Sequence, residues 1–283
     1  MRMTHKIVLT DDGFRVGVTE GGQGIPLVFL HGLSVSASAY TEMLELLAEN
    51  GFHVYAFDAP DHGSSDSLPW GHTVKDMAKV IAEAMVQIPT LEGARIVAVG
   101  HSMGGWIATE LAAMPRRSSW SIDDLILLDA AVGAEFHEGI RVNGVGGLLK
   151  GAQFLAGAAR DVYGDARRGG NLRTLRERLS LISRLSSSVS GPGIARAINA
   201  MVRCDSYWAL RDLRRNRVRT VIVHGEKDGI IPWRSALSAS EVARATIIFL
   251  IGKFHSWMIS DPQLALDVIL DALDLTPNDE DVT

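Results

Sequence analysis

Cysteine, long apolar runs and excess charge of either sign are all scarce in this chain of 283 residues. The single cysteine, Cys204, excludes an intrachain disulfide, and no cysteine–histidine cluster has the spacing of a zinc site. Every long apolar segment is broken by charge or glycine before it reaches the roughly 18 residues that a membrane-spanning helix needs. The apolar run at residues 7–9 is too short for a signal-peptide core. We therefore expect a cytoplasmic protein without a transmembrane segment.

The 28 basic and 33 acidic side chains leave a formal net charge of −5, which provides no global attraction to nucleic acid or anionic lipid. Locally, arginines outnumber acidic residues between positions 160 and 219. Anionic substrates or a lipid surface would explain this excess, but so would the exposed polar faces of amphipathic helices. We predict no nucleic-acid partner and leave open a peripheral lipid contact through these arginines.

Short apolar runs of strand length alternate with helical patterns along most of the chain. Such alternation predicts a parallel sheet with right-handed crossovers. An Asp-Gly turn at residues 12–13 separates the first two runs and predicts an antiparallel hairpin. We therefore predict an α/β fold with a mostly parallel, eight-stranded sheet flanked by helices. The expected strands lie at residues 7–10, 14–19, 27–30, 54–57, 96–99, 125–128, 221–223 and 247–251.

The gap between the strands expected at 125–128 and 221–223 is far longer than an ordinary connection. Its pattern is helical, with leucine and isoleucine at steps of three and four residues and glycine-rich breaks. We predict a helical cap at 133–216 inserted into a core formed by 1–132 and 217–276. The acidic tail at 277–283 has almost no apolar residues, and we expect it to be disordered.

A candidate nucleophile, Ser102, lies in Gly100-His101-Ser102-Met103-Gly104, directly after an expected buried strand and before a helical pattern. In this context G-x-S-x-G forms a strained turn that presents the serine hydroxyl above the sheet. The backbone N–H of Met103 and the positive end of the helix dipole can then face a developing oxyanion. The alternative is that Ser102 only caps the following helix.

A second oxyanion donor is expected in the loop that follows the strand at 27–30. The sequence there is His31-Gly32-Leu33, and glycine at the strand end lets the backbone direct the N–H of Leu33 toward Ser102. A plain turn, with His31 packed against the loop, is the alternative interpretation.

The base of a serine nucleophile must be a histidine, and three of the nine histidines follow Ser102 in the chain. His255 lies in the loop after the last expected strand, which ends above the sheet. His224 ends an apolar strand, where a buried structural role is expected, and His137 opens the inserted region. We therefore assign the base to His255.

The carboxylate that orients His255 is less tightly specified. Asp228 lies in a strand-end loop bracketed by glycines, and Asp129 ends the preceding strand, from which it could also reach the histidine. We assign the acid to Asp228 and keep Asp129 as its rival. Glu226 is interpreted as a solvated or loop-bracing charge.

These segments together resemble the α/β-hydrolase superfamily: HG at 31–32, DAPDHGSSD at 58–66, GHSMGG at 100–105, GEKDGIIP at 225–232 and FH at 254–255. The resemblance covers nearly the whole core and is greatest to esterases, lipases and carbon–carbon bond hydrolases that carry a helical cap after the sixth strand. It implies Ser102 as nucleophile, Asp228 and His255 as its partners, and Leu33 with Met103 as oxyanion donors. Dehalogenases and epoxide hydrolases of this fold use an aspartate nucleophile, so Ser102 argues against both.

The expected chemistry is cleavage of a carboxylic ester of a small or medium apolar molecule through an acyl-enzyme, with no metal or cofactor. A carbon–carbon hydrolase, a thioesterase or a perhydrolase would keep the same triad, and a non-catalytic binding protein would be expected to lack part of it. The natural substrate is not specified, and either a monomer or a homodimer is compatible with the sequence. The candidate pocket walls are Trp106, Phe154, Leu155, Tyr207, Trp208 and Trp257.

Overall fold

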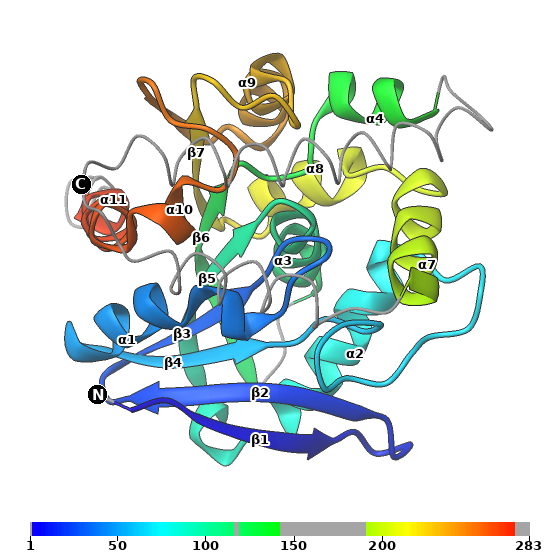
Figure 1. The fold of residues 1–283 in the computed structure, drawn as a ribbon, viewed down its shortest axis with the longest axis vertical. Coiled ribbons are helices and arrows are strands. Elements are labelled where there is room, and N and C mark those ends of the chain that lie inside the picture. The colour runs from blue at the N-terminus through cyan, green and yellow to red at the C-terminus, as the bar shows by residue number, and fades with distance from the viewer. Residues whose placement is uncertain (1, 116–118, 142–190, 275–283) are drawn as a thin grey trace, which may run out of the picture.

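The computed structural model describes residues 2–115, 119–141 and 191–274. Its centre is one eight-stranded sheet with the strand order β1-β2-β4-β3-β5-β6-β7-β8 (Figure 1). The β1–β2 and β2–β4 pairs are antiparallel, and all other neighbouring strands are parallel. The predicted fold class is therefore confirmed. The strands are β1 (Thr4–Leu9), β2 (Arg15–Gly22), β3 (Ile25–Leu30), β4 (Phe52–Phe57), β5 (Ala94–His101), β6 (Trp120–Leu128), β7 (Arg219–Gly225) and β8 (Thr246–Leu250).

The predicted N-terminal hairpin is present. Leu9 at the end of β1 pairs with Arg15 at the start of β2, and Gly13 in the connecting turn has a φ of 84°. A backbone in this left-handed region favours glycine, which is why the Asp-Gly pair marks the turn.

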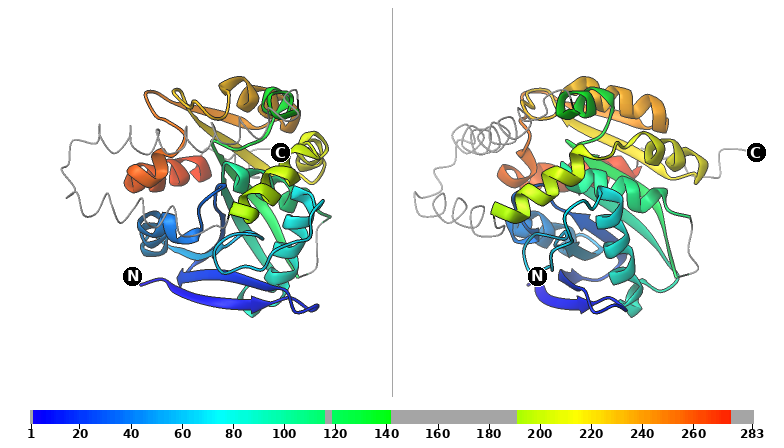
Figure 2. Two further views of the ribbon diagram at one scale, coloured as in Figure 1. Left: turned by 45° about the vertical axis from the view of Figure 1, so that its right-hand side comes forward. Right: turned by 90° about the vertical axis from the view of Figure 1, so that its right-hand side faces the viewer.

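Helices cover both faces of the sheet because alternate strand residues point to opposite sides. In β3, Leu27 and Phe29 pack with the helices of one face, while Val28 and Leu30 pack with those of the other. Figure 2 shows the two helix layers with the sheet between them. One layer holds α1 (Thr41–Glu49), α10 (Trp257–Ser260) and α11 (Pro262–Asp274). The other holds α2 (Val74–Val86), α3 (Met103–Ala113), α8 (Tyr207–Arg215) and α9 (Trp233–Ala243).

Only the ends of the predicted cap fall within the described residues. They contain α4 (Ala134–Arg141), which contacts α9, and α7 (Gly191–Val202), which contacts α2. At the far end of the predicted cap, α8 packs against α3 and α9, in the helix layer of the sheet. The division of the chain into core and cap remains a prediction, and the tail at 277–283 lies outside the described residues. No helix within the described part of the chain has the length and apolar character to span a membrane.

The parallel part of the sheet brings six following segments to one edge. Strands β3 to β8 all run in the same direction, so the segments after their carboxyl ends lie at the same edge although they are far apart in sequence. In open α/β sheets, ligands bind at this edge. The candidate residues predicted from the sequence lie in or next to these loops.

Candidate active site

Ser102 occupies the sharp junction between β5 and α3. Its backbone angles are φ 53° and ψ −120°, in a region that costs a residue with a side chain of order 1–3 kcal/mol. Hydrogen bonds from neighbouring segments hold it there. The Ser102 N–H donates to the Leu128 carbonyl at 3.1 Å, and the Ser102 carbonyl accepts from Ala131 N–H at 2.9 Å. The end of β6 thus keeps the serine in a conformation that an isolated turn would not adopt.

Close backbone approach explains the glycines around Ser102. A Cβ atom on Gly104 would lie 2.1 Å from the carbonyl oxygen of Leu30, and one on Gly105 would lie 2.4 Å from the Cβ of Ala130. A Cβ atom on Gly100 would lie 2.5 Å from the carbonyl oxygen of Gly104. Helix α3 therefore starts in direct contact with the ends of β3 and β6, which only glycine permits.

The loop after β3 lies against the serine. A Cβ atom on Gly32 would approach the Cβ of Ser102 to 3.3 Å, so the segment containing Leu33 is next to the junction. His31 fixes this loop: its Nδ1–H donates to the Gly32 carbonyl at 2.8 Å, and its Nε2 accepts from Ala59 N–H at 2.9 Å. The structure brings the expected donor loop to Ser102, while the roles of Leu33 and Met103 as oxyanion donors remain a prediction.

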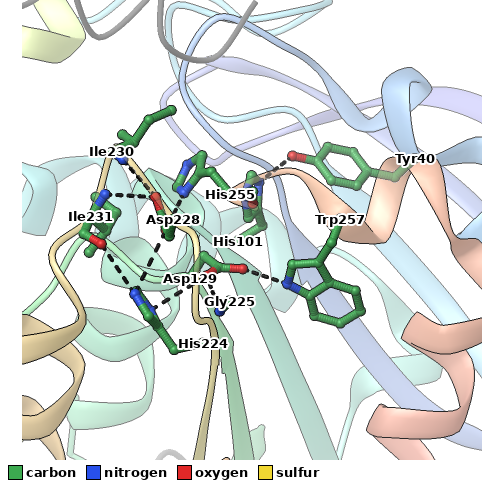
Figure 3. Close-up of polar contacts among 10 residues, drawn as sticks. All are labelled: Tyr40, His101, Asp129, His224, Gly225, Asp228, Ile230, Ile231, His255 and Trp257. Atoms are coloured by element: carbon green, nitrogen blue, oxygen red, sulfur yellow. Dashed lines mark hydrogen bonds and ion pairs between the residues drawn. The ribbon is translucent and has the colours of Figure 1, made fainter. Parts of the chain in front are cut away.

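His255 and Asp228 meet across the loops that follow β8 and β7. The Nδ1 of His255 lies 2.7 Å from Oδ2 of Asp228, and both side chains are buried (Figure 3). The other carboxylate oxygen, Oδ1, accepts hydrogen bonds from the N–H groups of Ile230 and Ile231 at 2.7 and 2.9 Å. Burial alone would raise the pKa of Asp228, but His255 and the other hydrogen-bonding neighbours outweigh it and lower this pKa below its ordinary value. Asp228 is therefore an ionised partner for the His255 ring.

His255 lies directly beside the serine junction. Its ring centroid is 4.7 Å from that of His101, the residue immediately before Ser102. The backbone carbonyl of His255 also accepts a hydrogen bond from Nε2 of His101 at 2.9 Å. The structure thus gathers the predicted serine, histidine and aspartate segments at one end of the sheet.

Asp129, the rival acid, has different partners. It follows β6 with a φ of 44°, and its carboxylate accepts hydrogen bonds from Gly225 N–H at 2.8 Å and from the Trp257 indole at 2.6 Å. Burial, and then the nearby Asp228, raise the pKa of Asp129 well above its ordinary value. Figure 3 shows Asp129 turned toward Trp257 and Gly225, while Asp228 faces the His255 ring. The geometry favours Asp228 as the acid.

Within the described residues, Asp129, Asp228 and His255 are the one cluster of side chains that could bind a metal ion, because their potential ligand atoms lie within 4.8 Å of one another. These atoms already have internal partners: His255 bonds to Asp228, and both oxygens of Asp129 accept N–H donors. A metal would have to break these hydrogen bonds, so the donor set favours a hydrogen-bond network over a metal centre.

The predicted pocket walls fall into three groups. Trp106 and Trp257 are completely buried, and their indole N–H groups donate to Glu110 at 3.2 Å and to Asp129 at 2.6 Å. Tyr207 and Trp208 lie on α8 and are exposed. Phe154 and Leu155 lie outside the described residues. A wall role for any of these residues remains a prediction.

Two contacts at this site were not expected from the sequence. Tyr40, in the segment between β3 and α1, hydrogen-bonds to His101, and Trp257 holds Asp129. The only sequence signal for the first is that His101 is a polar residue at the end of an apolar strand. Nothing in the local pattern around Tyr40 indicates its partner.

Five buried histidines make the fold sensitive to acid. Burial lowers the pKa of His31, His62 and His137 to about 4 and that of His101 to about 3, and it also lowers the pKa of His224, the fifth of them. Their pKa in an unfolded chain is about 6.5, so below that pH the unfolded state binds protons that the folded state rejects. The free energy of unfolding should fall as the pH drops from 6.5 toward 4, by up to about 1.4 kcal/mol per pH unit for each histidine. Urea unfolding at pH 7.5, 6.5, 5.5 and 4.5 measures this slope.

Two carboxyls, the buried Asp129 and the partly buried Glu110, have raised pKa values and oppose this trend, but the histidines outnumber them. His62→Gln is the matched control, because glutamine does not titrate. The variant should take up about one proton fewer on unfolding, so its free energy of unfolding should depend less steeply on pH. Stability that is constant or rises between pH 6.5 and 4.5 would contradict the assignment of these histidines as neutral.

Comparison with known proteins is consistent with this fold and site. A model of the alpha/beta hydrolase family matches residues 27–268. A putative non-heme haloperoxidase of Mycobacterium phage D29 is 44% identical over 277 residues, which cover 97% of each chain.

Solved structures show the same fold. An esterase from Exiguobacterium antarcticum superposes with a TM-score of 0.75 at 20% identity, over 96% of this chain and 100% of its own. A bromoperoxidase from Bacillus anthracis gives a TM-score of 0.73 at 18% identity, with the same shares covered. With the family model spanning most of the sequence, and a relative of nearly equal length at 44% identity, the chain belongs to the alpha/beta hydrolase family.

Proposed function

We propose that the protein is a serine hydrolase that cleaves a carboxylic ester of a small or medium apolar substrate. The observation that supports this most directly is the 2.7 Å hydrogen bond between His255 Nδ1 and Asp228, next to the strained junction that carries Ser102. A serine nucleophile needs a base, and the base needs a group that fixes its tautomer. The proposal assigns these roles to Ser102, His255 and Asp228, and it is supported by the bond to Asp228, which leaves Nε2 of His255 available to accept a proton.

In the proposed reaction, the Ser102 hydroxyl attacks the ester carbonyl while His255 Nε2 takes the hydroxyl proton. The N–H groups of Leu33 and Met103 hold the resulting oxyanion, and Asp228 stabilises the imidazolium. His255 then gives its proton to the departing alcohol, which leaves an acyl group on Ser102. A water molecule attacks this acyl group, again losing a proton to His255, and the acid is released with a free serine.

Hydrogen peroxide is a second candidate acyl acceptor, favoured by the 44% identical relative whose name is putative non-heme haloperoxidase. Peroxide would attack the acyl group on Ser102 in place of water and leave as a peroxy acid. The peroxy acid can oxidise a halide ion to hypohalous acid and return to the carboxylic acid. This route uses the same residues and differs only in the acceptor.

A fluorophosphonate probe tests the proposed nucleophile. Intact-mass measurement should show one probe per chain, and peptide mapping should place it on Ser102, because the probe traps a serine activated by an adjacent base. Ser235→Ala, which changes a buried serine in α9, should label like the wild type, whereas Ser102→Ala should not label. Labelling that survives Ser102→Ala would overturn the proposal.

The reaction itself is identified with a substrate panel. We expect turnover of p-nitrophenyl esters with a preference among acyl chain lengths, in the absence of added metal or cofactor. Acyl thioesters and ring-cleavage diketones test the thioesterase and carbon–carbon hydrolase alternatives with the same triad. Halogenation of monochlorodimedone in acetate, bromide and peroxide tests the peroxide route. A labelled Ser102 without turnover of any ester would overturn the assigned substrate class.

The remaining partner predictions concern the surface. Among the described residues, α8 presents three exposed arginines, Arg211, Arg214 and Arg215, beside the exposed Tyr207 and Trp208. Arg215 is paired with Asp212 at 2.9 Å, as expected for the polar face of an amphipathic helix. Lipid contact through the arginine-rich segment remains a prediction, as do a cytoplasmic location and a monomeric or homodimeric state.

A further inference from the structure

A row of buried hydrogen bonds runs behind the proposed catalytic residues. The hydroxyl of Tyr40, at the end of the short helix η1 (Ala37–Tyr40), lies 3.2 Å from Gly32 N and 2.6 Å from Nδ1 of His101. On its other side, Nε2 of His101 lies 2.9 Å from the carbonyl oxygen of His255. Tyr40 and His101 are both almost fully buried. Figure 3 shows the Tyr40 hydroxyl pointing toward the His101 ring, which lies beside His255.

Chemistry fixes the direction of each bond in this row. A carbonyl oxygen can only accept, so Nε2 of His101 must carry the proton that it shares with His255. In the neutral ring, Nδ1 then carries a lone pair and no proton, so it accepts a hydrogen bond from the Tyr40 hydroxyl. The Tyr40 oxygen in turn accepts from Gly32 N–H. Every donor therefore points along the row from Gly32 toward the His255 carbonyl.

The row is held in one protonation state. Burial lowers the pKa of His101 to about 3 and raises the pKa of Tyr40 far above its ordinary value. Both groups keep the same protons from mildly acidic to alkaline pH. The row thus serves as a fixed connection and does not transfer protons.

This connection joins three segments that the proposed reaction requires. Gly32 precedes Leu33 in the oxyanion loop, His101 precedes Ser102, and the row ends on the backbone of His255. His255 is consequently held at two points: its ring by Asp228 and its backbone by His101. Neither Tyr40 nor His101 is needed to accept the serine proton or to hold the oxyanion.

We propose that Tyr40 and His101 are positioning residues, which set the His255 imidazole and the Leu33 amide relative to Ser102 through this hydrogen-bonded row. The inference rests on the proposed serine hydrolysis, because it assigns these residues a role in that reaction. A displacement of about 1 Å between reacting groups can cost about 100-fold in rate, so a group outside the reaction can control it.

Removal of the row should lower kcat more than it changes KM. For Tyr40→Phe we expect a kcat about 10-fold below wild type, and for His101→Phe, which keeps a planar ring without hydrogen bonds, about 100-fold below, with KM within about 3-fold. In His101→Gln, the amide oxygen can accept the hydrogen bond from Tyr40 and the amide NH₂ can donate one to the His255 carbonyl. We therefore expect a kcat at least about 10-fold above that of His101→Phe.

Tyr55→Phe is the matched control. Its hydroxyl also bonds to two groups, Thr90 at 2.6 Å and His53 at 3.0 Å, but it lies on β4 outside the site. We expect Tyr55→Phe to reduce the melting temperature and to leave kcat within about 2-fold of wild type. If Tyr40→Phe also affects only the melting temperature, Tyr40 is merely structural and the proposal is wrong.

A double-mutant cycle tests whether the two residues act as one row. The Tyr40→Phe/His101→Phe double variant should lose clearly less than the product of the two single losses, because His101→Phe already breaks the Tyr40–His101 link and leaves only the bond from Gly32 N–H for the second change to remove. Losses in kcat that multiply would mean that the residues act independently, which contradicts the proposal.

The tautomer of His101 provides a readout that needs no enzymatic activity. With 15N-labelled histidine, NMR should show His101 as the neutral Nε2–H form throughout pH 5–9 in wild type, and Tyr40→Phe should alter the 15N shifts of both His101 and His255. An Nδ1–H tautomer, or ordinary titration of His101, would overturn the row even if esters are hydrolysed. Absence of fluorophosphonate labelling and of ester turnover, with the NMR result as expected, would instead refute the proposed hydrolysis.

Discussion

Ser102→Ala and His255→Ala should each lower the kcat for ester hydrolysis by about 10⁶-fold, and the double variant should lose no more than either single one. A serine without its base cannot release its proton, and a base without the serine has no nucleophile to activate, so the two residues act as one unit. The 2.7 Å contact with Asp228 and the close approach to the His101 ring put the His255 ring next to the segment that carries Ser102, which is what the proposed unit needs.

Rates are measured with a p-nitrophenyl ester at high enzyme concentration. Titration with the fluorophosphonate probe gives the fraction of wild-type enzyme that is active. About 10³-fold acceleration over water should persist in the variants, from substrate binding and the oxyanion donors. His62→Gln serves as the control, because this buried histidine lies near the oxyanion loop but has no part in the proposed reaction. Single-variant losses that multiply in the double variant would contradict a coupled pair.

The position of Ser102 at the junction between β5 and α3 could be predicted because its signals are local. A buried strand, two glycines around a serine and a helical pattern lie within a few consecutive residues, and each glycine is explained by a contact that a Cβ atom would block. The same holds for the N-terminal hairpin and for the mostly parallel sheet, which follows from strands that alternate with helices.

The sequence favoured Asp228 as the acid but could not remove Asp129 as its rival. Asp129 and Asp228 follow neighbouring parallel strands, β6 and β7, so both reach the same edge of the sheet. Which of them faces His255 depends on backbone angles and on partners far away in the chain. Asp129 is turned away by its positive φ and by Trp257, a residue 128 positions later in the sequence.

The Tyr40 contact illustrates the same limit. Tyr40 and His101 are separated by 61 residues, and no periodicity or spacing relates them. The bond between the buried Trp257 indole and Asp129 was likewise not expected from the sequence, which gave Trp257 only as a candidate pocket wall. Polar contacts between distant segments require the assembled fold, because a residue type indicates what a side chain can bond to but not what lies opposite.

Asp228→Asn should lower kcat by about 10⁴-fold, whereas Asp129→Asn should lower it less than about 10-fold. In Asp228→Asn, the amide oxygen can still accept from Ile230 and Ile231, but its NH₂ group then faces Nδ1 of His255. The ring would accept that proton at Nδ1 and carry its own proton on Nε2, which is the wrong tautomer for taking the proton of Ser102.

Asp129→Asn should act on stability instead of chemistry. Both carboxyl oxygens of Asp129 accept N–H donors, from Gly225 and Trp257, and an amide can satisfy only one of them. The other donor is left buried without a partner, at a cost of about 1–3 kcal/mol in the free energy of unfolding. Urea unfolding and kcat measured on both variants separate the two effects. A kcat lower in Asp129→Asn than in Asp228→Asn would reassign the acid to Asp129, because a bond that only supports the fold cannot matter more to the reaction than the bond that sets the tautomer of His255.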